Sequence, residues 1–107
     1  MPKGYWIGRV DVTELDKYSE YISAAAIPFK KYSARFIVAH GKRAGRGKLE
    51  TVEGNSRTHN VVIEFPNYQA ALDCWNSPEY ERARVIRAPI TRADIIIVEG
   101  YDGPQLS

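Results

Sequence analysis

Cysteine is almost absent from this chain of 107 residues, in which Cys74 is the single example. One cysteine excludes an intramolecular disulfide and a cysteine-rich zinc site. The only two histidines, His40 and His59, are too far apart in sequence to form a metal-binding motif, so no metal is expected. We interpret Cys74 as a small apolar residue on a helix, because no local motif marks a reactive thiol.

Long apolar runs are also missing. A membrane helix needs about 18 consecutive apolar residues, and a secretory leader needs an apolar stretch before a cleavage site. The chain has neither, so we expect a soluble cytoplasmic protein that does not enter a membrane. Phosphate-binding and dinucleotide-binding glycine motifs are absent as well, and no cofactor is expected.

Neither sign of charge dominates: the chain has 15 basic and 13 acidic residues, and its net charge is +2. Nucleic-acid-binding domains usually concentrate much more positive charge. The strand candidate at 60–65 also lacks the Lys/Arg-Gly-Phe/Tyr signature of RNA-recognition modules and carries Glu64 instead. We therefore expect no nucleic-acid partner.

The residues that are present describe one small α+β domain. Hydrophobic residues make up 44% of the chain, and its length suits a single domain over 1–107 with a loose tail at 101–107. Apolar and β-branched runs predict strands at 4–12, 34–40, 60–65 and 94–99. A three- and four-residue apolar spacing predicts a helix over 14–31, with Thr13 and Asp16 as a capping box and Pro28 disturbing its last turn.

The second helical unit is predicted in two parts, over 68–75 and from Ser77 to about Ala88. Asn67 and Ser77 are good caps, and Pro78 suits a first helical position. The glycine-rich stretch 41–57 reads as a long hairpin connection. The resulting order, β-α-β-β-α-β, predicts a ferredoxin-like fold with a four-stranded antiparallel sheet and all helices on one face.

Both faces of this sheet carry large apolar side chains. In 60–65, Val61, Ile63 and Phe65 oppose Val62 and Glu64, and simple alternation in 34–40 puts Ile37 and Ala39 opposite Phe36, Val38 and His40. Leaving ~500 Å² of one face in water would forgo roughly 12 kcal/mol of burial. We therefore expect a homodimer that covers the free sheet face with a second copy.

A set of motifs resembles the DUF1330 family across nearly the whole chain. They are Arg35-Phe36, Glu53-Gly54, Val62-Ile63-Glu64-Phe65-Pro66, Ala70-Ala71, Trp75 with Ser77-Pro78-Glu79-Tyr80, Arg87, Asp94 and Ile97-Val98-Glu99-Gly100. The resemblance implies a dimeric α+β barrel, in which two ferredoxin-like subunits pack sheet to sheet. Relatives in that superfamily include cofactor-free monooxygenases and muconolactone-isomerase-like proteins, so the fold alone does not choose a chemistry.

Two stretches depart from the family pattern. The second strand ends in Ala39-His40-Gly41, where relatives often have an Arg-Gly-Gly-like end. Asn55-Ser56-Arg57 follows the Glu-Gly pair, where relatives often have a tryptophan. A pocket built from these positions would differ in this chain.

Glu64 and His40 are the catalytic candidates. Glu64 interrupts an apolar strand, and a carboxylate there is either paired with a base such as Arg35, Arg9, His40 or Arg87, or available as a general base or ligand anchor. His40 ends a strand, where a histidine could transfer a proton to or from a ligand, although a surface histidine is the simpler reading.

Four further residues are ligand-binding candidates. Arg35 and Arg87 could hold a carboxylate, or form structural ion pairs. Trp6 and Tyr80 could line an apolar pocket, or pack in the core. These residues predict binding or transformation of a small organic molecule without a cofactor. A non-catalytic dimeric sensor or structural module is the alternative.

Overall fold

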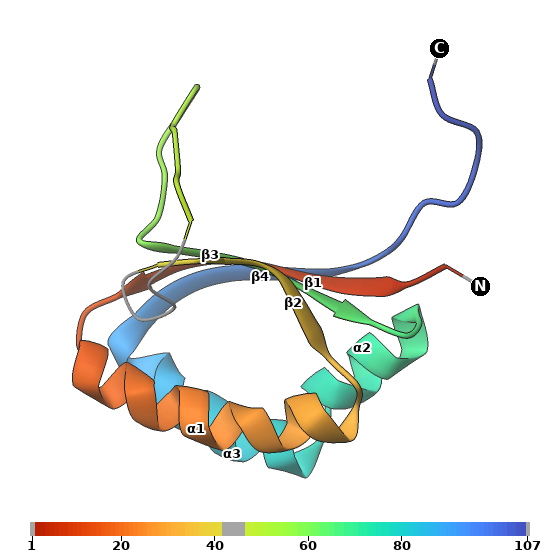
Figure 1. The fold of residues 1–107 in the computed structure, drawn as a ribbon. Coiled ribbons are helices and arrows are strands. Elements are labelled where there is room, and N and C mark those ends of the chain that lie inside the picture. The colour runs from red at the N-terminus through yellow and green to blue at the C-terminus, as the bar shows by residue number, and fades with distance from the viewer. Residues whose placement is uncertain (1, 42–46, 107) are drawn as a thin grey trace.

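The computed structural model describes residues 2–41 and 47–106 (Figure 1). The strands are β1 (Gly4–Val12), β2 (Arg35–His40), β3 (His59–Phe65) and β4 (Thr91–Glu99). The helices are α1 (Leu15–Lys31), α2 (Tyr68–Trp75) and α3 (Pro78–Arg87), followed by a short 3₁₀ turn, η1 (Ala88–Ile90). The predicted order and the break at Ser77 are confirmed.

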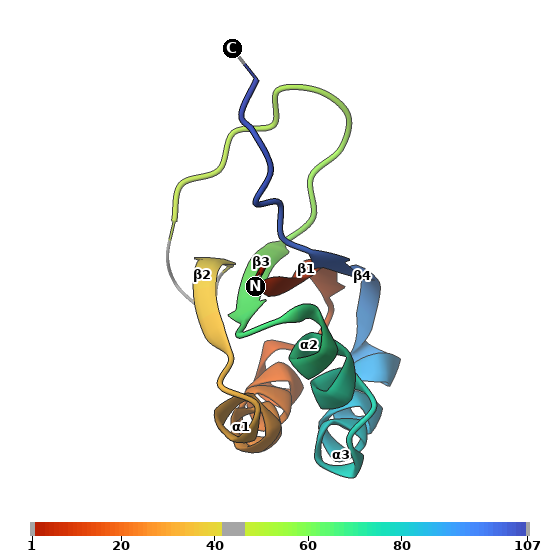
Figure 2. The same cartoon turned by 90° about the vertical axis from the view of Figure 1, so that its right-hand side faces the viewer.

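The four strands form one antiparallel sheet in the order β2-β3-β1-β4. All helices cover the same face, with α1 on the β2 side and α3 on the β4 side (Figure 2). The fold is therefore ferredoxin-like, as the element order predicts. Among the described residues, no helix has the length and apolar character needed to cross a bilayer.

Local sequence explains where α2 and α3 begin. Asn67 accepts the backbone N–H of Ala70 at 2.8 Å, and Ser77 accepts that of Tyr80 at 3.1 Å. Both predicted caps are thus confirmed. The capping box predicted at Thr13 is wrong: Glu14 is the cap residue without a side-chain bond, and the Thr13 hydroxyl donates to the Ile90 carbonyl at 3.0 Å. That carbonyl is available because the chain turns at η1 beside the start of α1.

The core lies between the sheet and the helices, around Trp6. Its indole N–H donates to the Ala71 carbonyl at 2.9 Å, which ties β1 to α2. The ring makes edge-on contacts with Phe29, Trp75 and Tyr80 at centroid distances of 4.9–5.4 Å. Aromatic rings packed edge to face bury much area per residue, so this cluster fixes the spacing of the two layers.

Strand β2 contains a bulge that sequence alternation does not reveal. Phe36 pairs with Ile63 and Val38 pairs with Val62, with a register shift between them. Ile63 and Val62 point to opposite faces, so Phe36 and Val38 do too, and the prediction that they share a face is wrong. One extra residue in a strand reverses the sheet face to which each preceding side chain points. Phe36 thereby reaches Phe29 of α1, with ring centroids 5.6 Å apart.

No helix of the described residues covers the opposite face of the sheet, here called the free face. Its apolar members include Ile96 at 55% and Val38 at 45% exposure. Two segments rise from the sheet on this side, the arm at 47–58 and the tail at 101–106 (Figure 1). They carry exposed apolar side chains at Leu49, Val52, Tyr101 and Leu106. The rest of the long connection, 42–46, and the end of the predicted tail lie outside the described residues.

Candidate functional site

A cavity of about 550 Å³ lies between α1 and the β2–β3 half of the sheet. Its volume falls in the usual range for small-molecule sites. The wall is mostly apolar, and a few polar groups interrupt it. The lining residues are Tyr18, Tyr21, Ile22, Ala25, Ala26, Phe29, Lys30, Ala34, Phe36, Ala39, His40, His59, Val61 and Ile63.

His59 is the most distinctive polar residue of this cavity. It is 3% exposed, and its ring lies against that of Tyr18 at a centroid distance of 5.1 Å. Nδ1 is 2.9 Å from the Thr58 hydroxyl oxygen, whereas the buried Nε2 has no hydrogen-bond partner among the described residues. Most buried polar atoms are hydrogen-bonded, so an unpartnered nitrogen on a residue that lines a cavity is a candidate contact for a ligand group.

Burial lowers the pKa of His59, and the neighbouring His40 lowers it further, while Asp11 acts in the opposite direction. The imidazole is therefore neutral near pH 7. A neutral imidazole in a largely apolar cavity can accept a hydrogen bond or a proton from a bound molecule. Burial also raises the pKa values of Tyr18 and Tyr21, so both tyrosines stay neutral.

Gly41 holds the His59 ring in place from the end of β2. Its φ of +151° is rare for residues with a side chain, and a Cβ there would lie 2.2 Å from Cδ2 of His59 and 2.8 Å from Nε2. Only glycine lets the backbone come this close to the ring. The Ala39-His40-Gly41 sequence that departs from the family pattern is thus part of this cavity.

His40, one of the two catalytic candidates, also lines the cavity. The side-chain amide of Asn60 lies 3.1 Å from its Nδ1 and donates to the Arg57 carbonyl at 3.2 Å. The amide nitrogen can donate to both groups, so Nδ1 of His40 accepts and its Nε2 carries the proton. The cavity therefore holds two histidines from neighbouring strands.

Glu64, the other catalytic candidate, lies on the free face. It accepts the Tyr5 hydroxyl at 3.3 Å, and its Oε1 is 3.8 Å from Nη1 of Arg35. The sequence placed Arg35 among the possible partners of Glu64, and the structure brings the two together. The sheet separates this pair from the cavity, so Glu64 and His40 do not form one site.

Arg87, Tyr80 and Trp6 lie in the core and do not line the cavity. The Tyr80 hydroxyl is 2.9 Å from that of Tyr21, and Arg87 sits 5.6 Å from the Tyr21 ring centroid. Arg87 is 6% exposed, and its bond to Thr91 is long at 3.4 Å. It contacts the cavity wall from behind, through Tyr21.

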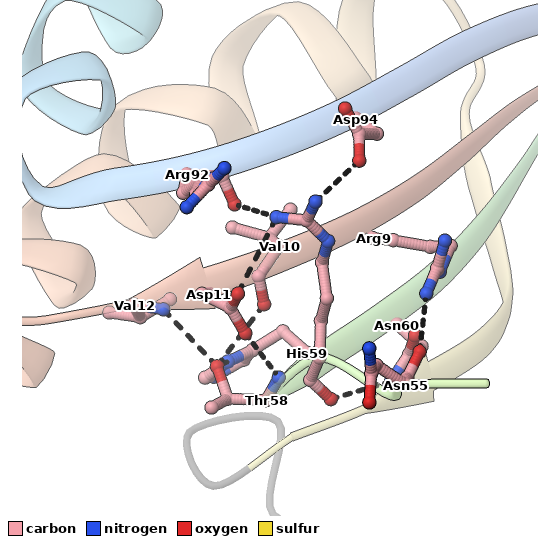
Figure 3. Close-up of polar contacts among 11 residues, drawn as sticks. Arg9, Val10, Asp11, Val12, Asn55, Thr58, His59, Asn60, Arg92 and Asp94 are labelled. Carbon is pink, nitrogen blue, oxygen red and sulfur yellow. Dashed lines mark hydrogen bonds and ion pairs between the residues drawn. The ribbon is translucent and has the colours of Figure 1, made fainter. Parts of the chain in front are cut away.

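A second polar cluster fastens the arm to the free face (Figure 3). Arg57 contacts Asp94 at 2.5 Å and Asp11 at 3.4 Å, and donates to the Arg92 carbonyl at 3.0 Å. Arg9 donates to the Asn55 carbonyl at 2.8 Å. These contacts bind the base of the arm to β1 and β4. The described residues contain no group of three or more side chains suited to hold a metal ion.

Sequence reasoning missed His59 as a site residue, although a signal for it existed. Alternation back from Phe65, Ile63 and Val61 reaches His59 on the same face of the strand. A histidine in register with helix-facing apolar residues is buried beneath the helices. The predicted strand began one residue too late to include it.

The fold is shared with several solved structures at low sequence identity. A protein of unknown function from Rhodopseudomonas palustris, RPA0582, is 12% identical, with a TM-score of 0.68 over 95% of this chain and 85% of that one. SnoaB, a cofactor-independent oxygenase from Streptomyces nogalater, is 10% identical, with a TM-score of 0.61 over 99% and 97%. A dimeric ferredoxin-like protein of unknown function from Thermobifida fusca is 14% identical, with a TM-score of 0.60 over 92% and 91%.

No curated protein matches the chain. A family model does match, over residues 3–101, which is nearly the whole length. That model covers every motif on which the resemblance rests, from Arg35 to Gly100. The chain belongs to the family described as Domain of unknown function (DUF1330).

Proposed function

We propose that the protein binds a small, largely apolar organic molecule in the cavity between α1 and the sheet, with Nε2 of His59 facing the polar end of that molecule. The observation that carries this proposal is a buried nitrogen that has no partner among the described residues, on a residue lining a mostly apolar space of about 550 Å³. Such a cavity suits a molecule of one or two rings. Binding needs no cofactor, and His40 lies within the same cavity wall.

Chemistry beyond binding would begin with transfer of a proton from the ligand to His59. The likeness to a cofactor-independent oxygenase supports testing this step, because a bound molecule that loses a proton becomes more reactive toward an electrophile. A sensor that only binds, or a purely structural module, would show no such proton transfer. Turnover of the bound molecule separates the enzyme from the sensor.

Filling the cavity tests the binding proposal. Ala39 lines it, so the Ala39→Phe variant should abolish saturable binding of 2-naphthol, measured by titration of ligand fluorescence. Ala88→Phe adds the same ring at an exposed position outside the cavity and should bind as the wild type does. A wild-type protein that shows no saturable binding of 2-naphthol or of any other one- or two-ring probe, or equal binding by both variants, would refute the proposal.

We further propose that the protein is a homodimer joined through the free face. All helices lie on the other side, and the arm and the tail present exposed apolar groups on the free-face side. A stable interface buries about 800 Å² per partner, which an uncovered four-stranded sheet with two flanking segments can supply. The dimeric description of the Thermobifida fusca protein supports the same assembly.

Two exposed residues of equal accessibility test the dimer. Ile96 on the free face and Val85 on α3 are both 55% exposed. Light scattering after gel filtration should give about twice 12.1 kDa for the wild type and Val85→Lys, and one copy for Ile96→Lys. A monomeric wild type would overturn the proposal. In the dimer, Glu64 and Arg35 would lie in or beside the interface.

A further inference from the structure

Thr58, the residue before β3, makes contacts that define the state of the His59 ring. Its backbone N–H donates to Asp11 at 3.0 Å, which fixes the residue against β1. Its hydroxyl oxygen lies within hydrogen-bond distance of three groups: the Val12 N–H at 3.1 Å, the Val10 carbonyl at 3.1 Å and Nδ1 of His59 at 2.9 Å (Figure 3).

The protons available to these groups decide the direction of each bond. A hydroxyl has one proton to give and can accept two bonds. The Val10 carbonyl can only accept, and the Val12 N–H can only donate. All three contacts become hydrogen bonds when the hydroxyl donates to Val10 and accepts from both Val12 and a proton on Nδ1 of His59.

The opposite tautomer of His59 satisfies fewer groups. With the His59 proton on Nε2, the Thr58 hydroxyl would have to donate its own proton to Nδ1. The hydrogen bond from Thr58 to the Val10 carbonyl would then be lost, and the two oxygen atoms would face each other. This tautomer would also leave a buried N–H donor on Nε2 with no acceptor among the described residues. One hydrogen bond more corresponds to a roughly tenfold preference, so the Nδ1–H form dominates.

We propose that Thr58 holds His59 as its Nδ1–H tautomer, so that Nε2 presents a bare lone pair, and that the cavity therefore selects molecules whose polar end donates a hydrogen bond. Phenols, enols and ring N–H groups fit this requirement. Ethers and ketones do not fit Nε2 of His59, because they can only accept a hydrogen bond. The selectivity rests on the proposed function, whereas the tautomer is a property of the ligand-free protein.

The His59 ring has little room to rotate into another orientation. Gly41 lies against one side of it, and the Tyr18 ring contacts it at an interplanar angle of 56°. Turning the ring over would separate Nδ1 from Thr58. Thr58 is therefore a positioning residue: it acts on a ligand through His59.

The tautomer is tested by long-range ¹H–¹⁵N correlation spectra of the ligand-free protein at pH 7.5. The wild type and Thr58→Ser, which retains the hydroxyl, should show a protonated Nδ1 and an unprotonated Nε2. Thr58→Val removes the hydroxyl and should shift His59 toward the Nε2–H form. A wild-type spectrum with the proton on Nε2 overturns the proposal even if the valine variant does not fold.

Selectivity is tested with two probes of similar shape, 2-naphthol and 2-methoxynaphthalene. The wild type and Thr58→Ser should bind 2-naphthol about tenfold more tightly, which corresponds to one hydrogen bond. Thr58→Val should lose most of that difference, and equal wild-type affinities would overturn the selectivity. If neither probe binds while the spectra show the expected tautomer, the proposed function and the selectivity fail and the positioning role of Thr58 stands.

Discussion

Replacing Gly41 by alanine tests whether backbone proximity holds the His59 ring. Gly41 and Gly54 both have a positive φ, at +151° and +75°. A Cβ on Gly41 would collide with the His59 ring, whereas a Cβ on Gly54 would meet nothing within 4 Å. Both substitutions therefore meet a positive φ, and only Gly41→Ala adds a collision with the histidine.

The magnitudes follow from these two terms. A residue with a side chain at a positive φ loses about 1–2 kcal/mol, and this term alone applies to Gly54→Ala. Gly41→Ala must also displace the ring, at a cost of roughly 0.5–1.5 kcal/mol for a strained side-chain rotamer. It loses the contact to Thr58 as well, which is worth about 0.5–1.5 kcal/mol. We expect Gly41→Ala to be less stable than Gly54→Ala by about 1–3 kcal/mol.

Thermal unfolding of both variants at one protein concentration measures this difference. For a domain of this size, 1 kcal/mol shifts Tm by about 4–8 °C, so Gly41→Ala should melt at least about 4 °C below Gly54→Ala. The imidazole resonances of His59 should move only in Gly41→Ala. Equal melting temperatures together with unchanged His59 resonances would refute the packing argument.

Three further outcomes are expected. Tyr21→Phe should lower the free energy of unfolding in urea by about 1–3 kcal/mol because it leaves the buried Tyr80 hydroxyl without its partner at 2.9 Å, and adding Tyr80→Phe should cost less than the sum of the single changes. Burial raises the pKa of the Cys74 thiol to about 12, so native protein should resist a thiol reagent at pH 8, and rapid labelling would contradict this. The pKa of His59 is lower in the folded protein than its ordinary value of 6.5, so the unfolded chain binds a proton first as the pH falls. The free energy of unfolding should therefore decrease as the pH drops from 6.5 toward the lower folded pKa. Urea midpoints at pH 7.5 and 5.5 should differ less for His59→Gln than for the wild type.

Much of the fold can be predicted from the sequence because its signals are local. Asn67 and Ser77 each stand before a helix that they cap, and the structure confirms both. Thr13 has the same type of signal, yet its hydroxyl bonds to Ile90, 77 residues away in sequence. A local motif cannot reveal a competing acceptor that tertiary structure brings close. The predicted last strand began at Asp94, and the earlier start of β4 at Thr91 was missed because Arg92 interrupts the apolar pattern there.

The candidate site was less predictable because its parts come from separate segments. Glu64 stood out as a charge within an apolar run, and its contact with Arg35 was among the foreseen pairings. The hydrogen bonding and position of His59 depend on Thr58 beside it and on Gly41, which directly follows β2. Gly41 and His59 are 18 residues apart, and no sequence pattern predicts a contact between residues at that spacing.

The bulge between Phe36 and Val38 also governs how the sheet can grow. Strand β2 is an outer strand, and the extra residue interrupts the regular row of N–H and C=O groups along its open side. A strand from another molecule cannot stay in register across that interruption, which is how natural sheets resist edge-to-edge polymerisation. The same irregularity that turns Phe36 toward α1 thus protects the molecule against fibre-like assembly along the β2 edge.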